Sequence, residues 1–406
     1  MRIASLWVPD FPLAALRRSF PELKERPLAV VRGPSARDAV IAVSGEAQAL
    51  GVQVGMTAAQ ARQLSREVEI KSVPQEVERA ASAALWDVAW GFSPRVRQVR
   101  PGLVWLDVGS QAVREEALAL RLWRSCLRVG MMAHVGMGNS GMLATVAAHT
   151  AQVRVVPPGE ERVFLGPLPI SLAEPSPVCR HRLELWGVRS FAVLAQLPRG
   201  DVGARLGPEG LALHRLACGE GEEFLPDPPV EEVREGVWLE DPVGSLEGCL
   251  FVLNGILSRL KERLSLRGEG FAQVRVELAL EGGGRREYPL PLLAPTSEVP
   301  ALLALTRLLL TASPPGSAVE GVMVEVRGGV VRSCQSSLFG PPRPHPGSLA
   351  AVLVRLSAIV GPHRLGQPQR ADSHHPSAWR LVPFTLAQGD TRFFFFFFFF
   401  FFFFFL

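Results

Sequence analysis

The stretch IAVSGEAQALGVQVGMTAAQA, residues 41–61, decides the fold of this sequence of 406 residues. Two apolar runs, Leu28–Val31 and Val40–Val43, lead into it and are predicted to be strands. Ser44 and Thr57 each precede a short helical pattern, and glycine turns separate and close these patterns. The stretch therefore predicts a small α/β insert near the start of the chain.

Strands and helices are expected to alternate on both sides of this insert as far as about residue 155. Apolar spacing predicts strands over 1–8 and 102–108 and helices over 77–90 and 115–127. From 164 to 219 the pattern becomes helical, with tight glycine hinges. A Pro-rich acidic linker, PDPPVEE, follows at 226–232 and marks a domain boundary.

The next hundred residues have a regular order of expected elements, β-α-β-β-α-β. The expected elements are a strand at 234–239, a helix at 246–264, a hairpin of strands 272–280 and 286–290, a second helix at 299–310 and a last strand at 319–326. A Pro-, His- and Arg-rich tail follows Gly328, and we expect it to be partly extended.

Composition is typical of a globular protein in a reducing compartment. Hydrophobic residues make up 48% of the chain and the formal net charge is +4, so charge alone does not indicate nucleic-acid binding. The five cysteines lack metal-ligand spacing, and the N-terminus does not read as a secretory signal, so we expect a cytoplasmic protein. Thirteen consecutive Phe and a Leu fill 393–406. We assign this low-complexity run no function, because it is shorter than a membrane span of about 20 residues and an artefact explains it best.

Three motifs in order resemble those of the Y-family translesion DNA polymerases. Residues 41–61 resemble the fingers segment V-x-S-Y-E-A-R-x-x-G-V-x-x-G-M without a gap. Downstream, VWLDVGS (104–110) resembles the family's F-L-D-V strand, and VGMGNSGMLATVAAHT (135–150) resembles its G-I-x-x-N-K-x-L-A-K-x-A palm helix. LELWGVRSFAVLAQLP (183–198) with RLGPEGLALHRLACGE (205–220) looks like the helix-hairpin-helix thumb, and the β-α-β-β-α-β unit fits the little finger.

The resemblance implies an α+β multidomain chain with the right-hand fold of these polymerases. Its parts would be a palm with fingers, a helix-hairpin-helix thumb, a β-α-β-β-α-β little finger, and an extended C-terminal tail that binds a sliding clamp. The predicted bounds are 1–155 for palm and fingers (fingers about 26–71), 156–227 for the thumb, 232–330 for the little finger and 331–392 for the tail.

Polymerases of this family hold two metal ions with carboxylates, because hard cations need oxygen ligands. The family's first motif, D-x-D-x-F, falls on residues 7–11, so Trp7 and Pro9 occupy its acidic positions. The second motif, S-x-D-E, falls on 100–103, so Gly102 and Leu103 occupy the other two. None of these four side chains can bind a metal ion, although an error of register in the first strand is an alternative.

Neighbouring acids are poor substitutes. Asp10 is one residue out of register, and Asp107 lies four residues beyond Leu103, about 13 Å along a strand. The triphosphate-binding Tyr and Arg of the family correspond to Gly45 and Gln48. Their side chains are a hydrogen atom and a neutral amide, which cannot replace a phenol and a guanidinium. The resemblance therefore implies that the chain is not an enzyme and needs no metal or cofactor. The alternative is an active translesion polymerase with atypical ligands.

Two features of the tail resemble ImuB-type proteins, the polymerase-like members of bacterial mutagenesis cassettes. One is the ending ADSHHPSAWRLVPF (371–384). The other is the pentapeptide QSSLF, in which Gln335, Leu338 and Phe339 look like a sliding-clamp-binding peptide with two apolar anchors and a register-setting amide. The resemblance implies an adaptor in DNA repair, translesion synthesis and induced mutagenesis. Its partners would be the clamp, an error-prone C-family polymerase and a RecA-like protein.

The thumb turn at Gly187 and Val188 is a weaker candidate for contact with damaged or primer-template DNA, because such hairpins can present backbone amides to phosphates. A plain helix-helix turn is the alternative. Four histidines of the tail fit no closed metal site, and a solvated basic tail explains them better; they are His345, His363, His374 and His375. A DNA-binding module unrelated to replication stays open as a third interpretation, and no membrane partner is expected.

Overall fold

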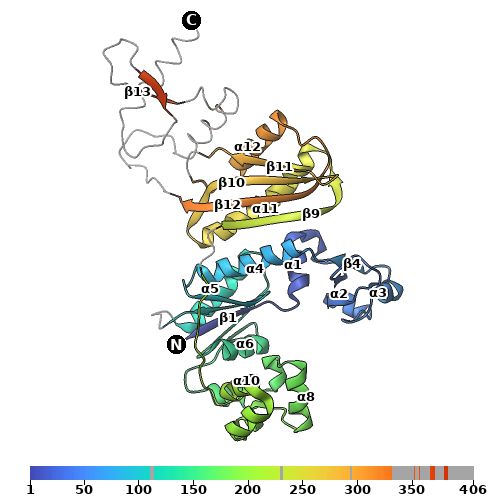
Figure 1. Cartoon of the computed structure of the whole chain (residues 1–406), viewed down its shortest axis with the longest axis vertical. Coiled ribbons are helices and arrows are strands. Elements are labelled where there is room, and N and C mark those ends of the chain that lie inside the picture. The colour runs from blue at the N-terminus through green and yellow to red at the C-terminus, as the bar shows by residue number, and fades with distance from the viewer. Residues whose placement is uncertain are drawn as a thin grey trace.

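The computed structural model describes most of the chain up to residue 331 (Figure 1). The described residues are 1–109, 114–228, 232–292, 295–331, 352, 356, 366–370 and 379–382. We keep the names palm, fingers, thumb and little finger for its parts, while the exact boundaries stay predictions. In Figure 1 the little finger, palm and thumb follow one another along the long axis, and the fingers project to one side.

The palm is built on a five-stranded sheet with the order β5-β6-β1-β7-β8. The central strand β1 runs antiparallel to both of its neighbours, and β7 runs parallel to β8. The strands are β1 (Ile3–Trp7), β5 (Val96–Arg100), β6 (Leu103–Asp107), β7 (His134–Gly138) and β8 (Val153–Val155). The helices are α1 (Phe11–Ser19), α4 (Gln75–Trp90), α5 (Glu115–Arg128) and α6 (Gly141–Thr150), with a short 3-10 turn η1 (Pro21–Leu23) after α1.

The two faces of the palm sheet are covered differently. Ala4, Leu6 and Val8 point into the main core together with the apolar faces of α1, α4 and α5. Alternate residues of a strand point to opposite faces, so Ser5 and Trp7 face α6 instead. α6 lies very close to β7, because a Cβ built on Gly136 would stand 1.8 Å from a backbone oxygen of α6. One face is thus a conventional helix-covered core, and the other carries the candidate site.

The fingers form a small unit with its own core. Strands β2 (Leu28–Val31), β3 (Val40–Val43) and β4 (Glu69–Ser72) pair in the order β3-β2-β4, and the helices are α2 (Gly45–Ala49) and α3 (Ala58–Leu64). The Ser44 hydroxyl accepts a hydrogen bond from the Ala47 amide, 3.3 Å away. Thr57 and Gln60 form a reciprocal capping box. The helix starts predicted at Ser44 and Thr57 are therefore confirmed.

The thumb is a set of short helices whose core includes one side of α6. Its elements are α7 (Glu161–Leu165), η2 (Ile170–Ala173), α8 (Pro177–Leu185), α9 (Phe191–Gln196) and α10 (Arg199–Ala217). α10 is kinked at Gly207, whose φ of 67° is outside the helical range, just before Pro208. Because α6 packs on strands β1 and β7 and contributes Leu143, Val146 and Ala147 to the thumb core, the thumb is attached to the palm through buried apolar side chains.

The little finger has the predicted order β-α-β-β-α-β, here β9-α11-β10-β11-α12-β12. Its sheet is antiparallel with the order β11-β10-β12-β9, and α11 and α12 contribute their apolar sides to its core. The elements are β9 (Glu232–Val243), α11 (Leu246–Leu266), β10 (Glu269–Leu280), β11 (Arg285–Leu290), α12 (Val299–Ala312) and β12 (Val319–Val330). α11 also contacts α4, so the little finger rests on the palm.

Two short strands of the tail, β13 (Gln367–Arg370) and β14 (Trp379–Val382), pair antiparallel. The predicted clamp-binding peptide at 335–339, the four tail histidines and the Phe run lie outside the described residues. Within the described part of the chain, none of the helices is both long enough and apolar enough to cross a membrane.

Candidate functional site at one end of the palm sheet

Trp7 and Leu103, two of the positions that the family motifs single out, face each other across adjacent strands. They are direct partners in the antiparallel register of β1 and β6. On the other side of β1, Trp7 is the register partner of His134 in β7. The structure therefore brings the first and second motif positions together at one end of the sheet.

Pro9 and Gly102 lie at the same end, in the segments that enter and leave these strands. The Val8 amide donates to the Gly102 carbonyl over 2.8 Å. Gly102 closes the tight turn between β5 and β6 with a φ of 78°, a left-handed conformation that favours glycine. A Cβ at Gly102 would stand 2.7 Å from the Phe11 ring, so this glycine also makes room for the start of α1.

The sheet face around Leu103 is filled by apolar side chains. Ile3, Leu103 and Trp105 form a small cluster with Phe224, which belongs to the segment that leaves the thumb. The same segment follows the edge strand β5, because the Asp227 amide donates to the Val96 carbonyl over 2.8 Å. This part of the palm surface is therefore covered by the chain itself.

Trp7 sits between two histidines. Its ring lies 4.1 Å from that of His149 and 5.3 Å from that of His134, in edge-on geometry. The His149 Nδ1 donates to the Leu172 carbonyl over 2.8 Å, which leaves Nε2 unprotonated in the neutral ring. Burial lowers the pKa of His149, although that carbonyl and the Glu174 carboxylate oppose the shift. His149 is therefore neutral near pH 7.

A charged pair from two different parts of the chain lies beside this cluster. Arg100, the last residue of β5, donates to the Glu174 carboxylate, and a Glu174 oxygen lies 3.8 Å from the His149 Nε2. Glu174 comes from the thumb and has a left-handed backbone, with φ of 50°. Sequence reasoning missed Glu174 and both histidines, because nothing in their local pattern points to the palm.

A buried hydroxyl ties β1, β6 and α6 together. The Thr145 Oγ1 accepts from the Trp105 indole nitrogen over 2.8 Å and lies 3.0 Å from the Ser5 Oγ. It also donates to the Gly141 carbonyl one helical turn earlier, over 2.9 Å. Because Trp105 and Ser5 belong to adjacent strands, this hydroxyl fixes α6 on the site face of the sheet.

The remaining predicted site residues lie away from this cluster. Gly45 and Gln48 are exposed on α2 in the fingers. Gly187 turns the thumb chain between α8 and α9 with φ of 69°. The amides of Gly187 and Val188 already donate to the carbonyls of Glu184 and Leu183, over 3.0 and 2.9 Å. Phosphate contact at this turn would therefore depend on neighbouring groups.

Acidic side chains near the motif positions have other partners or point elsewhere. Asp107, at the far end of β6, accepts from the Gly109 amide over 2.9 Å and pairs with Arg95 at 3.3 Å. Asp10 is exposed at the start of α1. Among the residues that the structure describes, three or more His, Cys, Asp or Glu side chains never gather in a geometry that could hold a metal ion. The expectation that the chain uses no metal stays a prediction.

Comparisons with known proteins agree with this architecture. A family model, the impB/mucB/samB family, matches residues 6–149, which are the palm and fingers. Among solved structures, a Y-family DNA polymerase chimera, Dbh-Dpo4(243-245)-Dbh, matches with a TM-score of 0.51 and 17% identity, over 80% of this chain and 98% of the chimera. The chain therefore has the fold of a Y-family DNA polymerase, and its residues 6–149 are similar in sequence to the impB/mucB/samB family. The predicted fold class is thereby confirmed.

Several curated relatives of this Y-family polymerase-like chain are polymerases by name. DNA polymerase IV of Dehalococcoides mccartyi (strain CBDB1) is 28% identical over 208 residues, 49% of this chain and 53% of the relative. DNA polymerase IV 2 of Mesorhizobium japonicum is 30% identical over 198 residues, 46% of each chain. DNA polymerase IV of Legionella pneumophila (strain Philadelphia 1) is 23% identical over 276 residues, 64% of this chain and 76% of the relative. The chain thus spans about half the length of the first two.

These relatives contradict the prediction that the chain is not an enzyme, since they are named DNA polymerase IV and a polymerase is an enzyme. The prediction rested on the four acidic positions, on Gly45 and Gln48 at the triphosphate positions, and on the judgement that the neighbouring Asp10 and Asp107 are poor substitutes. It did not weigh acids from distant parts of the chain. The structure shows why that step was too strong. Glu174 of the thumb reaches Arg100, next to the Gly102 turn, so carboxylates outside the motifs can approach this end of the palm.

Proposed function

We propose that this Y-family polymerase-like chain is an adaptor of the ImuB type in DNA damage tolerance. It would hold damaged or primer-template DNA, dock on the replicative sliding clamp, and bring an error-prone C-family polymerase and a RecA-like protein to the site during translesion synthesis. The observation that carries the proposal is that Trp7 and Leu103 are register partners at one end of the palm sheet of a polymerase-like fold. We assign Trp7, Pro9, Gly102 and Leu103 to the family's acidic positions. These assignments, with Gly45 and Gln48 at the triphosphate positions, are part of the proposal.

The thumb supplies the side chains for the DNA-binding part. Arg205 lies 5.7 Å from the exposed Trp186 ring next to the Gly187 turn, and the Arg182 guanidinium donates to the Arg205 carbonyl over 2.7 Å. Arg189 is exposed on the other side of the turn. Cations grouped around a helix-hairpin-helix turn can bind the phosphates of the DNA backbone. Such contacts fix the position of the protein on DNA without reading the base sequence. Gly187 and Val188 would shape this contact.

The tail supplies the clamp-binding part. In the proposed mode, Leu338 and Phe339 enter an apolar pocket of the clamp and Gln335 sets the register with hydrogen bonds. Apolar anchors of this kind commonly carry most of the binding free energy. In the sequence, the peptide follows β12 (Val319–Val330), the last strand of the little finger.

An active translesion polymerase is the second candidate, because the curated relatives are named DNA polymerase IV. An adaptor role and polymerase activity do not exclude each other, since clamp docking uses the tail and synthesis would use the palm. Both candidates must therefore be measured on the same protein.

The experiment compares three full-length proteins for clamp binding and for primer extension with Mg²⁺ and nucleotides. They are the unchanged chain, Leu338→Ala with Phe339→Ala, and the matched control Ser336→Ala with Ser337→Ala from the same pentapeptide. We expect the first variant to bind the clamp at least about thirtyfold more weakly, because a single anchor residue is commonly worth about 2 kcal/mol. The serine control should bind like the unchanged chain.

Equal clamp binding by all three proteins would contradict docking through this peptide. Metal-dependent extension by the unchanged chain would establish the second candidate. The affinity of the unchanged chain for a labelled primer-template is measured in parallel. DNA affinity without any clamp binding would favour the third interpretation, a DNA-binding module unrelated to replication.

A further inference from the structure

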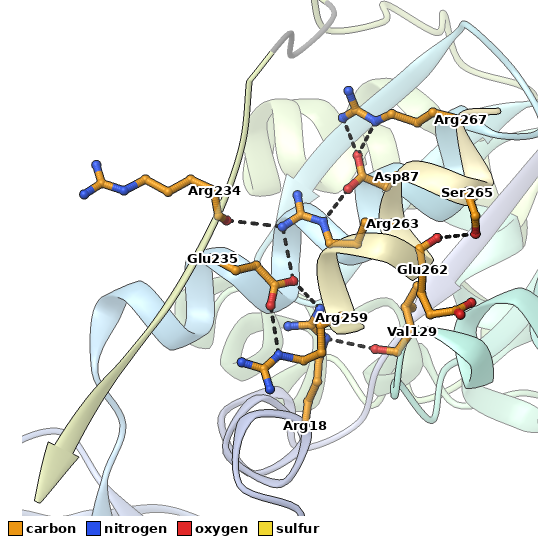
Figure 2. Close-up of polar contacts among 10 residues, drawn as sticks. All are labelled: Arg18, Asp87, Val129, Arg234, Glu235, Arg259, Glu262, Arg263, Ser265 and Arg267. Atoms are coloured by element: carbon orange, nitrogen blue, oxygen red, sulfur yellow. Dashed lines mark hydrogen bonds and ion pairs between the residues drawn. The ribbon is translucent and has the colours of Figure 1, made fainter. Parts of the chain in front are cut away.

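A buried network of charged side chains joins the palm to the little finger (Figure 2). Its first half surrounds Glu235, on strand β9 of the little finger. The Arg18 guanidinium of palm helix α1 donates to one Glu235 oxygen over 2.5 Å, and Arg263 donates to the same oxygen over 3.2 Å. Arg259 donates to the other oxygen over 2.9 Å. The Glu235 and Arg18 side chains are each only 1% exposed.

The second half surrounds Asp87, on palm helix α4. The Arg263 Nε donates to one Asp87 oxygen over 2.5 Å, and the Arg267 Nε donates to the other over 2.8 Å. Asp87 is fully buried and Arg263 is 1% exposed. Arg263 therefore contacts both carboxylates and links the two halves, as Figure 2 shows.

The network is reciprocal across the joint. Asp87 of the palm receives arginines of the little finger, while Glu235 of the little finger receives Arg18 of the palm. Each part thus contributes one carboxylate, and that carboxylate binds at least one arginine of the other part. We call the group of Arg18, Asp87, Glu235, Arg259, Arg263 and Arg267 the clasp.

Apolar contact across the same joint is sparse. The palm and the little finger have separate cores, and partly buried Phe20 is packed against both. Leu266, at the end of α11, reaches the palm core. A cleft of about 360 Å³ opens beside Asp87, between α4, β5 and α11. Among the described residues, the buried charge pairs are therefore a main link between these two cores, beside Phe20 and Leu266.

The charges within the clasp are not balanced. Burial alone would raise the pKa of Glu235, but the positive charges of Arg18, Arg263 and Arg259 outweigh it and lower that pKa to about 2. Burial also lowers the pKa of Arg18, and its Nη1 is buried without a hydrogen-bond partner. Removing one carboxylate would leave buried guanidiniums uncompensated, which costs far more than losing a surface pair.

We propose that Asp87 and Glu235 are positioning residues that set the orientation of the little finger on the palm, and that neutralising either one undocks the little finger without unfolding it. Undocking is feasible because each part keeps its own core and the freed side chains are charged and become hydrated. The functional consequence, a fixed spacing between thumb and little finger for DNA, rests on the proposed function. The orientation itself does not.

A steric change tests the same joint without altering any charge. A Cβ at Gly91, the residue that ends α4, would stand 2.6 Å from the backbone oxygen of Leu266. Gly91 has a right-handed helical conformation, so a larger residue is compatible with its own backbone. Gly91→Leu should therefore act as a wedge between α4 and α11.

The experiment measures the full-length chain without DNA or clamp, by small-angle X-ray scattering and hydrogen exchange. The variants are Asp87→Asn, Glu235→Gln and Gly91→Leu, and the control is Glu277→Gln, which removes an exposed-face carboxylate paired with Arg234 and Arg285. We expect Asp87→Asn, Glu235→Gln and Gly91→Leu each to have a larger radius of gyration than the unchanged chain. Amides at 86–90 and 259–266 should exchange at least about tenfold faster, while β1 and β10 keep their protection.

Two results would overturn the proposal. One is an unchanged scattering profile with unchanged exchange at 86–90 and 259–266 in the charge variants. The other is faster exchange throughout β1 and β10, which would mean that these residues stabilise the whole fold instead of setting an orientation. Because neither readout uses a ligand, failure of the clamp or DNA experiments would leave this test unaffected.

Discussion

Replacing Glu235 with Gln should lower the free energy that docks the little finger on the palm by about 3 kcal/mol at neutral pH. The folded-state pKa of Glu235 is about 2, against an ordinary value of 4.5. A difference of about 2.5 units corresponds to roughly 3 kcal/mol, at about 1.36 kcal/mol per unit. That value also lies at the lower end of the 3 to 5 kcal/mol, roughly, that breaking one side of a buried ion pair costs.

The pH dependence gives a second, independent check. Because the pKa of Glu235 is depressed in the folded state, its contribution is fully present above pH 4.5 and is lost as pH falls towards 2. The difference between the unchanged chain and Glu235→Gln should therefore be roughly halved near pH 3 and vanish below pH 2.

Urea denaturation followed by tryptophan fluorescence is the suitable assay, because urea is uncharged and does not screen ion pairs as guanidinium does. The first transition, in which the little finger leaves the palm, should move to a lower urea concentration at pH 7. Glu277→Gln, which loses two arginine partners on the open face of the sheet, should change stability by less than about 1 kcal/mol. A loss below about 0.5 kcal/mol for Glu235→Gln, or a loss of equal size at pH 3, would refute this reasoning.

Two further predictions concern the site face of the palm. Gly136→Ala should lower the free energy of unfolding by about 3 kcal/mol or more, since its Cβ would meet the Ala144 backbone. Gly138→Ala should lower it less, because its Cβ would meet only the flexible Leu143 side chain. Thermal denaturation of both variants tests this difference. Thr145→Val should lower the free energy of unfolding by about 1 to 3 kcal/mol, because the Trp105 indole loses its acceptor. Thr145→Ser keeps a hydroxyl and should retain most of that stability. Equal melting temperatures of the two Thr145 variants would contradict this prediction.

Local pattern was sufficient for many of the elements. The strands Leu28–Val31 and Val40–Val43 have the bounds that their apolar runs predict, and both finger helices begin at their predicted caps. The edge strands β5 and β8 were not singled out, because sequences such as VRQVR lack a continuous apolar run. Edge strands bury fewer side chains, so their composition carries less signal.

The clasp was not predicted, although its residues leave a trace in the sequence. Asp87 stands three residues after Ala84 on the buried side of α4, and Arg263 stands three after Leu260 on the buried side of α11. Glu235 falls between Val233 and Val237, both buried. A charge at an apolar-face position signals a buried partner. The partner's identity could not follow, because Asp87 and Arg263 are 176 residues apart.

The candidate site shows a different limit of sequence reasoning. Matching four positions to a family motif selected residues that the structure brings to one end of the palm sheet, since Trp7 and Leu103 are register partners there. That this end is the functional one stays a prediction. The same match could not predict that Glu174 and His149 approach from the thumb and α6. Tertiary contacts, not the motif, determine which groups meet at this end of the sheet.

The two joints of the palm differ in physical character, and this difference indicates which part can move. The thumb shares a core with palm helix α6 and is further tied by the Asn139 amide, which donates to the Gly219 carbonyl over 2.9 Å. Separating it would expose apolar surface to water, which is costly. The little finger is held to a large extent by paired charges, which regain hydration when they separate. Motion in this chain should therefore occur at the clasp, with palm and thumb moving as one unit.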